Sequence, residues 1–72
     1  MTVDETLNVR INGEQRRVAS GINVAALIAE LGLNAKRVAV ERNLAIVPRS
    51  TFGQVEVEDG DQYEIVHFVG GG

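Results

Sequence analysis

Apolar and polar side chains alternate near the start of the chain. Over residues 6–11 every second side chain is apolar, and this period of two predicts a half-buried strand. Asn12-Gly13 follows, a dipeptide typical of tight hairpins because both residues tolerate positive φ. Residues 14–18 then read as a return strand that is polar enough for a sheet edge. The chain is therefore expected to open with a β-hairpin.

The apolar spacing next changes to three and four residues. One stripe of a helix is formed by Val24, Leu27, Ile28 and Leu31. Asn23 is a suitable N-cap, because its side-chain oxygen can accept a first-turn amide proton. Gly32 can take the left-handed position after the helix, with Leu33 packing back on Ile28 as in a Schellman ending. A helix is predicted between these two signals.

Shorter extended segments follow the predicted helix. In order, we expect a strand at 38–41, a turn at 42–43, a strand at 44–47, an irregular crossover at 50–53, an extended segment at 54–57 and a turn at 58–61. Pro48 ends the second of these strands because it cannot donate to a ladder, and Phe52 is expected to anchor the crossover to the core. Residues 62–69 form the longest strand-like run of the chain.

The order of these elements predicts the fold class. One helix with a single apolar stripe must cover one face of a sheet, so the domain is α+β. The helix after the opening hairpin provides a crossover, and the last strand could then lie parallel to the first, between its neighbours. We therefore predict a β-grasp: a mixed sheet of four to five strands packed on one main helix. It would occupy residues 1–69, and residues 70–72 would form a flexible tail.

Composition narrows the possible functions. The chain has no Cys and one His, which excludes disulfides, thiolate zinc sites and a nucleophilic thiol. The net charge of −3, with scattered basic residues, argues against nucleic acid as a partner. No apolar run approaches the length that spans a membrane, and the first 15 residues carry acids in place of a basic signal region. A cytoplasmic protein with no membrane partner and no bound metal is expected.

The chain ends in Gly70-Gly71-Gly72, directly after the longest predicted strand. A frayed terminus is one interpretation. Alternatively, three residues without Cβ atoms can extend about 10 Å into a narrow cleft of another protein. The terminal carboxylate is ionised at neutral pH and reacts only when joined to a leaving group, most simply AMP from ATP. A sulfur donor could then displace AMP and leave a thiocarboxylate on Gly72.

Several short fragments in the second half resemble a known family. They are residues 38–43, 46–49, 59–61, 64–66 and 69–72. In this order and at this length they resemble the thiamin-biosynthesis sulfur carrier family (ThiS), and the first half is similar in layout. Phe52 stands where many relatives have Trp, and Gly70 occurs in some members only. Neither difference affects the carboxylate chemistry.

The resemblance implies a β-grasp fold shared with ubiquitin, and a set of partners. A ThiF-type enzyme would consume ATP to adenylate the Gly72 carboxylate, and sulfur would come from a persulfide supplied by a cysteine desulfurase. The Gly72 thiocarboxylate would deliver sulfur to thiazole synthase (ThiG). The chain would then be a cosubstrate, not an enzyme, with no cofactor of its own and monomeric when free.

Several other residues are candidates for partner contacts or for catalysis. Val66 and Phe68 are expected on the sheet face away from the helix, where docking to a partner is favoured over cover by a neighbouring loop. Arg49 is expected either to contact a partner or to be an ordinary exposed surface residue, and the sequence favours neither. His67 lacks an orienting carboxylate and is interpreted as structural instead of a general base. The acidic turn at 58–61 is interpreted as solvated.

Three other functions remain open from the sequence. One is a sulfur carrier for another pathway, of the molybdopterin synthase small-subunit type, although those proteins are longer and have prolines before the glycines, whereas this chain has Pro48 alone. A second is a ubiquitin-like modifier conjugated to lysines, which isopeptide adducts would reveal. A third is a non-covalent β-grasp interaction domain, which would keep its function without Gly71 and Gly72.

Overall fold

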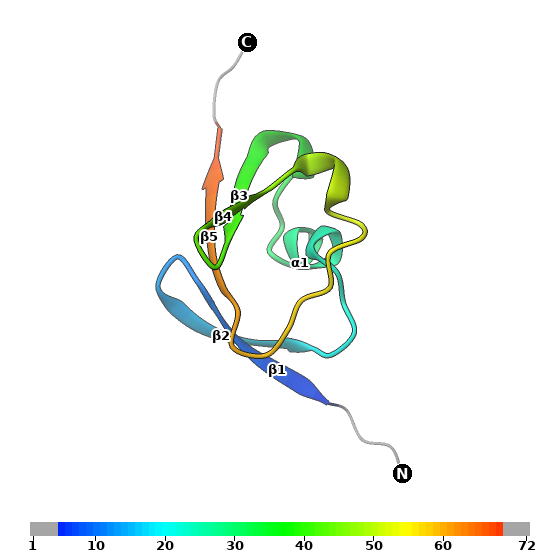
Figure 1. The fold of residues 1–72 in the computed structure, drawn as a ribbon, viewed down its shortest axis with the longest axis vertical. Helices are drawn as coiled ribbons and strands as arrows, with labels where there is room; N and C mark the ends of the chain where they lie inside the picture. The colour runs from blue at the N-terminus through cyan, green and yellow to red at the C-terminus, as the bar shows by residue number, and fades with distance from the viewer. Residues whose placement is uncertain (1–4, 69–72) are drawn as a thin grey trace.

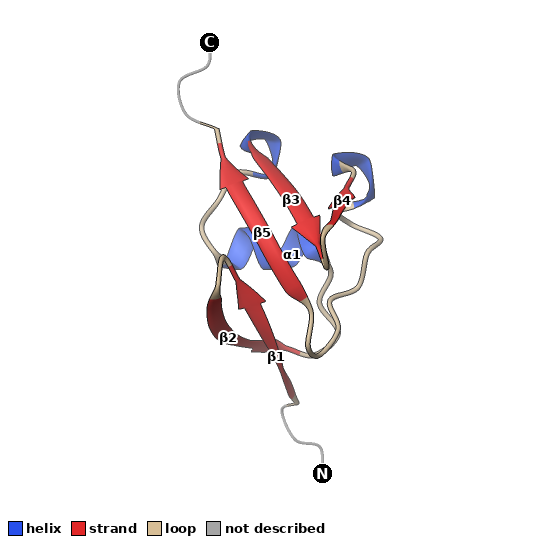
Figure 2. Ribbon diagram, turned by 60° about the vertical axis from the view of Figure 1, so that its left-hand side comes forward, coloured by secondary structure: helices blue, strands red, loops and turns tan. Residues whose placement is uncertain are grey.

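The computed structural model describes residues 5–68, and Figure 1 shows their arrangement. The elements in chain order are β1 (Thr6–Ile11), β2 (Glu14–Ala19), α1 (Val24–Glu30), η1 (Ala35–Arg37), β3 (Val38–Arg42), β4 (Ala45–Val47), η2 (Arg49–Thr51) and β5 (Gln62–His67), where η marks a 3₁₀-helix. One five-stranded sheet holds the strands in the order β2-β1-β5-β3-β4. Figure 2 shows α1 lying across the back of this sheet.

The sheet has the predicted β-grasp topology. Its central strand, β5, is the last of the described strands, and it pairs parallel with β1 on one side and antiparallel with β3 on the other. The hairpins β1–β2 and β3–β4 are antiparallel, so the sheet is mixed. The predicted α+β class, the single main helix and the position of the last strand are confirmed.

Both hairpins turn through residues with positive φ. Asn12 and Gly13 have φ of 52° and 85°, as a type I′ turn requires, and they connect the strands where the sequence predicts. The second turn uses Asn43 and Leu44, with φ of 51° and 73°. The predictions of a turn at 42–43 and of a strand from residue 44 are therefore each wrong by one residue, because β3 continues to Arg42 and β4 begins at Ala45.

The short helix α1 has a partner for each amide of its first turn. A helix leaves its first four N–H groups without intrahelical acceptors. Here three of them are paired, Val24 N to Val55 O (2.9 Å), Ala25 N to Phe52 O (2.9 Å) and Ala26 N to Asn23 Oδ1 (2.8 Å), and Leu27 N to Asn23 O (3.0 Å) is the first i→i−4 bond of the helix. The crossover between β4 and β5 thus supplies two carbonyls, and Asn23 is the N-cap that the sequence predicts.

The other end of α1 is a Schellman motif, as predicted. The helix ends at Glu30, Gly32 has φ of 75°, and the Leu33 amide donates to the Ile28 carbonyl at 3.1 Å.

The core lies between α1 and the inner face of the sheet. Its most buried side chains include Val24, Leu27, Ile28, Val9, Val40 and Tyr63. Phe52 is also buried, which confirms that it anchors the crossover.

Candidate functional site

The predicted reactive group, the Gly72 carboxylate, lies outside the described residues, as do Gly70, Gly71 and Val69. The structure describes the strand that leads to them. β5 ends at His67, and the Phe68 amide donates to the Arg37 carbonyl at 2.7 Å. The start of the last strand thus lies between β1 and β3, and its end, up to Phe68, is held by β3 and the residue before it. The strand expected over residues 62–69 ends at His67 within the described residues, and Val69 lies outside them.

β5 divides its side chains between the two faces of the sheet, because successive side chains of a strand point in opposite directions. Tyr63 and Ile65 are 1% and 7% exposed and point into the core. Val66 and Phe68 are 56% and 51% exposed. Their predicted position on the open face is confirmed, and the alternative of cover by a neighbouring loop is wrong.

Two further exposed apolar residues were missed by the sequence analysis. Leu44, in the β3–β4 turn, is 91% exposed, and Ile46 of β4 is 75% exposed. Together with Val66 and the polar residues Glu41 and Glu64 they line an open groove, about 410 Å³ in volume, over β3, β4 and β5. We call this the β3–β5 groove. The period of two in this strand could have predicted that Ile46 faces outward, because the neighbouring Val47 faces the core.

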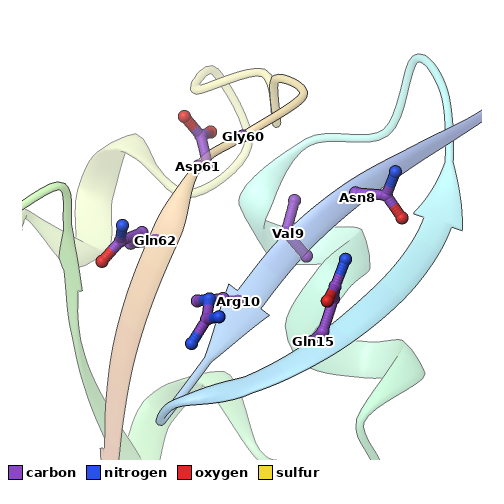
Figure 3. A pocket seen from close by; sticks show the side chains of 7 residues that line it. All are labelled: Asn8, Val9, Arg10, Gln15, Gly60, Asp61 and Gln62. Atoms are coloured by element: carbon purple, nitrogen blue, oxygen red, sulfur yellow. The ribbon is translucent and has the colours of Figure 1, made fainter.

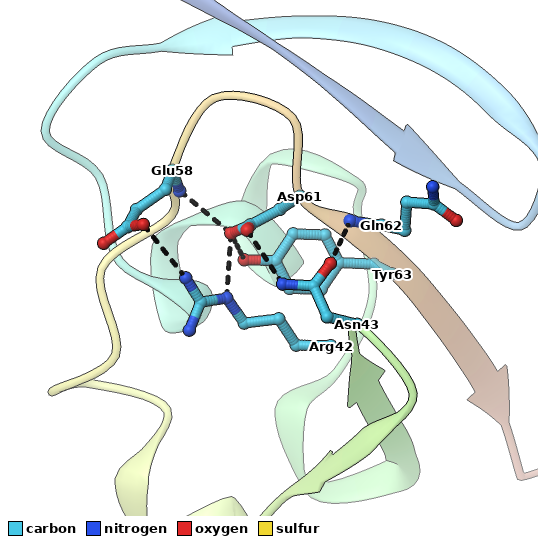
Figure 4. A network of polar contacts seen from close by, with 6 residues as sticks. All are labelled: Arg42, Asn43, Glu58, Asp61, Gln62 and Tyr63. Atoms are coloured by element: carbon cyan, nitrogen blue, oxygen red, sulfur yellow. Dashed lines mark hydrogen bonds and ion pairs between the residues drawn. The ribbon is translucent and has the colours of Figure 1, made fainter.

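A network of polar contacts around Asp61 is shown in Figure 4. Its carboxylate accepts hydrogen bonds from Arg42 Nε (2.8 Å), Asn43 Nδ2 (3.1 Å), the Glu58 amide (2.9 Å) and the Tyr63 hydroxyl (2.9 Å). Asp61 is only 4% exposed. The prediction of a solvated acidic turn is therefore wrong for Asp61, although it holds for Glu58 and Asp59, which are exposed.

The charges within this network stabilise one another. Burial raises the pKa of Asp61, but the hydrogen bonds from Arg42, Glu58, Asn43 and Tyr63 outweigh it, so the pKa lies below its ordinary value. The pKa of Arg42 is raised, first by its hydrogen bond to Asp61. Burial and then the hydrogen bond to Asp61 raise the pKa of Tyr63. Asp61 therefore stays ionised and fully bonded, which is the behaviour of a structural carboxylate.

The network joins segments that are distant in sequence. Arg42 and Asn43 belong to the β3–β4 hairpin, Asp61 directly precedes β5, and Tyr63 lies at the start of β5. Glu58 adds an exposed ion pair with Arg42 at 3.6 Å. The sequence fragments that resemble the ThiS family, 38–43 and 59–61, meet in this network. Its geometry fixes the entry of β5 into the sheet.

Arg49 makes contacts within the chain. Its Nε donates to the Ala35 carbonyl and its terminal nitrogen to the Val38 carbonyl, each at 3.0 Å. The guanidinium therefore ties η2 to η1 and the start of β3. Its predicted role in partner binding stays a prediction.

His67 is exposed at the end of β5, opposite Val38. Within residues 5–68 there is no group of three or more His, Cys, Asp or Glu side chains that could hold a metal ion. The α-helix within residues 5–68, α1, has 7 residues and is too short to span a membrane.

Figure 3 shows a small polar hollow where β1 and β5 separate. It has a volume of about 190 Å³, and Arg10 and Gln15 face it from β1 and β2. The turn before β5 spans the gap, because the Asn8 amide donates to Asp59 Oδ1 (2.8 Å) and the Gly60 amide to the Asn8 carbonyl (2.7 Å). The hollow is a gap in the ladder that one side-chain and one backbone hydrogen bond bridge.

Comparison with known proteins gives consistent matches. The family model described as the ThiS family matches residues 9–72. The sulfur carrier protein ThiS of Bacillus subtilis is 50% identical over 46 residues, covering 64% of this chain and 70% of that protein. The crystal structure of the thiamine biosynthesis protein ThiS from Geobacter metallireducens superimposes with a TM-score of 0.78 at 36% identity, covering 92% of this chain and all of that one.

A longer protein also contains a similar segment. Thiazole synthase of Paramagnetospirillum magneticum is 56% identical over 62 residues, a match that covers 86% of this chain and 19% of that protein. The chain thus spans about a fifth of the length of this relative.

Proposed function

Because the chain belongs to the ThiS family, we propose that it is a sulfur carrier protein of thiamin biosynthesis and that the Gly72 carboxylate carries the sulfur. The observation that supports this most directly is the position of β5. The strand that precedes the glycines is the central strand of the sheet, paired with β1 at its start and with β3 along its length to His67. A rigid strand followed in the sequence by three glycines suits a terminus that must enter another protein.

The proposed chemistry begins with activation. The carboxylate oxygen of Gly72 attacks the α-phosphorus of ATP on a ThiF-type enzyme, and pyrophosphate leaves. A persulfide, R–S–S⁻, then attacks the acyl carbon and AMP leaves with one carboxylate oxygen. A thiolate attacks the R-bound sulfur of this acyl disulfide, which releases the thiocarboxylate and forms a new disulfide. ATP is consumed by the partner, and the persulfide derives from a cysteine desulfurase.

In this scheme the chain is a cosubstrate, and residues 5–68 serve recognition. The exposed apolar side chains Val66 and Phe68 precede the glycines, so a partner that binds them is also positioned for the terminus. Leu44 and Ile46 extend the same apolar surface toward the sheet edge. Partner sites are often marked by such surfaces. We therefore propose that the adenylating enzyme and thiazole synthase both dock on this face.

The test is the intact mass of the protein after incubation with ATP, the adenylating enzyme and a sulfur source. The expected result is a gain equal to the replacement of one oxygen by sulfur, localised to Gly72. Deletion of Gly71 and Gly72 should abolish the gain and the synthesis of thiazole. Isopeptide adducts on other proteins, or thiazole synthesis that survives the deletion, would contradict the proposal.

A further inference from the structure

Two carboxylates face each other on the open side of the sheet. Glu41 of β3 lies directly opposite Glu64 of β5 in the antiparallel register, and both side chains are exposed. Figure 2 looks onto this face, with α1 behind it. Directly opposite residues have Cβ atoms about 4.5–5.5 Å apart, and like charges at this separation destabilise a strand pair. This pair therefore lowers the stability of the sheet it belongs to.

No side chain of residues 5–68 offsets this repulsion by an ion pair with Glu41 or Glu64. Within residues 5–68, Arg42 forms ion pairs with Glu58 and Asp61, so the Arg42 guanidinium is already engaged. Arg10 lies on the open face beside Gln62 and lines a hollow together with Glu64, but it donates to the Gly13 carbonyl at 3.4 Å and forms no ion pair with either carboxylate. As far as residues 5–68 are concerned, the two carboxylates thus remain available to a cation from outside.

The same carboxylates line the β3–β5 groove, beside the apolar side chains of Leu44, Ile46 and Val66. Leu44 adds a second unfavourable feature, because a branched apolar side chain is held at φ of 73° and is 91% exposed. Residues kept in such conformations cluster at functional positions. The groove therefore combines apolar surface with two carboxylates, and a ligand that fits it must offer both an apolar group and a positive charge.

We infer that the β3–β5 groove receives a partner surface that presents an apolar side chain next to an arginine or lysine, with the cation between Glu41 and Glu64. This inference rests on the proposed function, since it specifies how the carrier docks. An arginine fits best, because its planar fork can donate to two carboxylates. A second copy of this chain fits poorly, because it would bring the same two carboxylates into the groove and a net charge of −3.

Thiazole synthase is the partner that we choose as the probe. A thiazole synthase is among the relatives that contain a segment similar to this chain. The experiment is isothermal calorimetry with the thiazole synthase of the same organism, at about 50 mM and about 300 mM salt so that screening is varied. It needs neither ATP nor sulfur, so it is independent of the mass measurement that tests the proposed function.

The variants are Glu41→Gln, Glu64→Gln and the double substitution. Each single change should weaken binding about tenfold at low salt, as the loss of one charge-assisted contact implies, and should reduce the salt dependence. The same changes should raise the thermal midpoint of the free protein by about 1–5 °C, because they remove the repulsion. Lower affinity with higher stability is a combination that a structural role would not produce.

Glu14→Gln is the matched control. It makes the same change in net charge on β2, at the opposite edge of the sheet, on the face that carries α1. Binding should stay as in the wild type. Unchanged affinity in the double variant would overturn the inference, as would an equal loss in Glu14→Gln. A concentration-dependent dimer in sedimentation that the double variant alters would also overturn it, by making a second copy the occupant.

Failure of the proposed function would look different. In that case the wild type would show no mass gain at Gly72, whatever the calorimetry gives. A normal mass gain together with unaffected binding of the Glu41 and Glu64 variants would overturn the docking inference alone.

Discussion

The side chain of Asn12 pairs with the backbone of Ile65 as though it were a further residue of β1. Its Oδ1 accepts from the Ile65 amide at 2.8 Å, and its Nδ2 donates to the Ile65 carbonyl at 3.0 Å. In the ladder before it, Arg10 N and Asn12 N donate to the carbonyls of Asp61 and Tyr63. β1 turns away at Asn12, so the amide side chain adds the next contact to β5.

The other hairpin repeats this device. Asn43, also at positive φ, accepts from the Gln62 amide through its Oδ1 at 2.9 Å, and its own amide donates to the Gln62 carbonyl at 2.7 Å. Turn asparagines therefore hold β5 from both sides. The two contacts position the strand that carries Val66 and Phe68.

Replacement of Asn12 tests this arrangement. Asn12→Gly keeps the positive φ but removes both hydrogen bonds to Ile65, and we expect a loss of about 1–2 kcal/mol in the free energy of unfolding. Asn12→Asp should cost at least as much, because it keeps the acceptor and places a carboxylate against the Ile65 carbonyl. Urea unfolding measures both variants. A glycine variant as stable as the wild type would show that the side chain contributes nothing.

The Asp61 network predicts a dependence of stability on pH. The pKa of Asp61 is lower in the folded state than its ordinary value, so its contribution is fully present above about pH 4 and is lost as the pH falls through the folded value. Asp61→Asn should cost about 2–3 kcal/mol at pH 7, because Arg42, Tyr63 and the Glu58 amide lose a charged acceptor. The difference from the wild type should shrink at pH 3, measured by urea unfolding.

Glu58→Gln is the control for this experiment. Its side chain is 70% exposed and also reaches Arg42, at 3.6 Å. Exposed ion pairs contribute about 0–1 kcal/mol, so its effect should be small at pH 7. If the Asp61 and Glu58 variants lost equal stability, the buried position of Asp61 would not be the cause.

We predict that Arg49 stabilises the folded protein, whether or not it also contacts a partner. Arg49→Lys cannot reach the Ala35 and Val38 carbonyls with a fork of donors, and we expect a loss of about 1 kcal/mol, with a somewhat larger loss for Arg49→Ala. Thermal unfolding followed by circular dichroism is the measurement. Unchanged unfolding in both variants would show that the two contacts are not stabilising and would favour a role limited to partners.

The open face is predicted to bind partners through its apolar residues. Val66→Asp or Phe68→Asp should weaken binding to the adenylating enzyme or to thiazole synthase by about tenfold or more, since a charge would be buried in the interface, and should leave the fold intact. Calorimetry measures the affinity. Gln54→Asp, an exposed change on the crossover, is the control for added charge. Unchanged affinity of both β5 variants would exclude this docking face.

Leu44→Gly offers a separate test of the same face. Glycine suits the positive φ of this position, so the stability of the free protein should be unchanged or higher, while the affinity for partners falls. A variant that binds normally would show that the most exposed apolar side chain of the turn lies outside the interface.

The amino-acid pattern by itself determined the main helix, the strands of the sheet and their order, although it did not predict the 3₁₀-helices η1 and η2. The alternation in 6–11, the stripe of α1 and the capping residues Asn23 and Gly32 act locally, so their spacing was enough to predict them. The same holds for the open face of β5, because the period of two assigns Val66 and Phe68 to the side opposite Tyr63.

Only the tertiary structure decided which polar residues meet. Asp61 read as part of a solvated turn because four acids surround it in the sequence, yet the fold places Arg42, Asn43 and Tyr63 around its carboxylate. The opposition of Glu41 and Glu64 likewise depends on the register between β3 and β5. Strand register is a long-range property, set by packing against α1 and by the turn asparagines. The local spacing of residues in the sequence therefore does not determine the register.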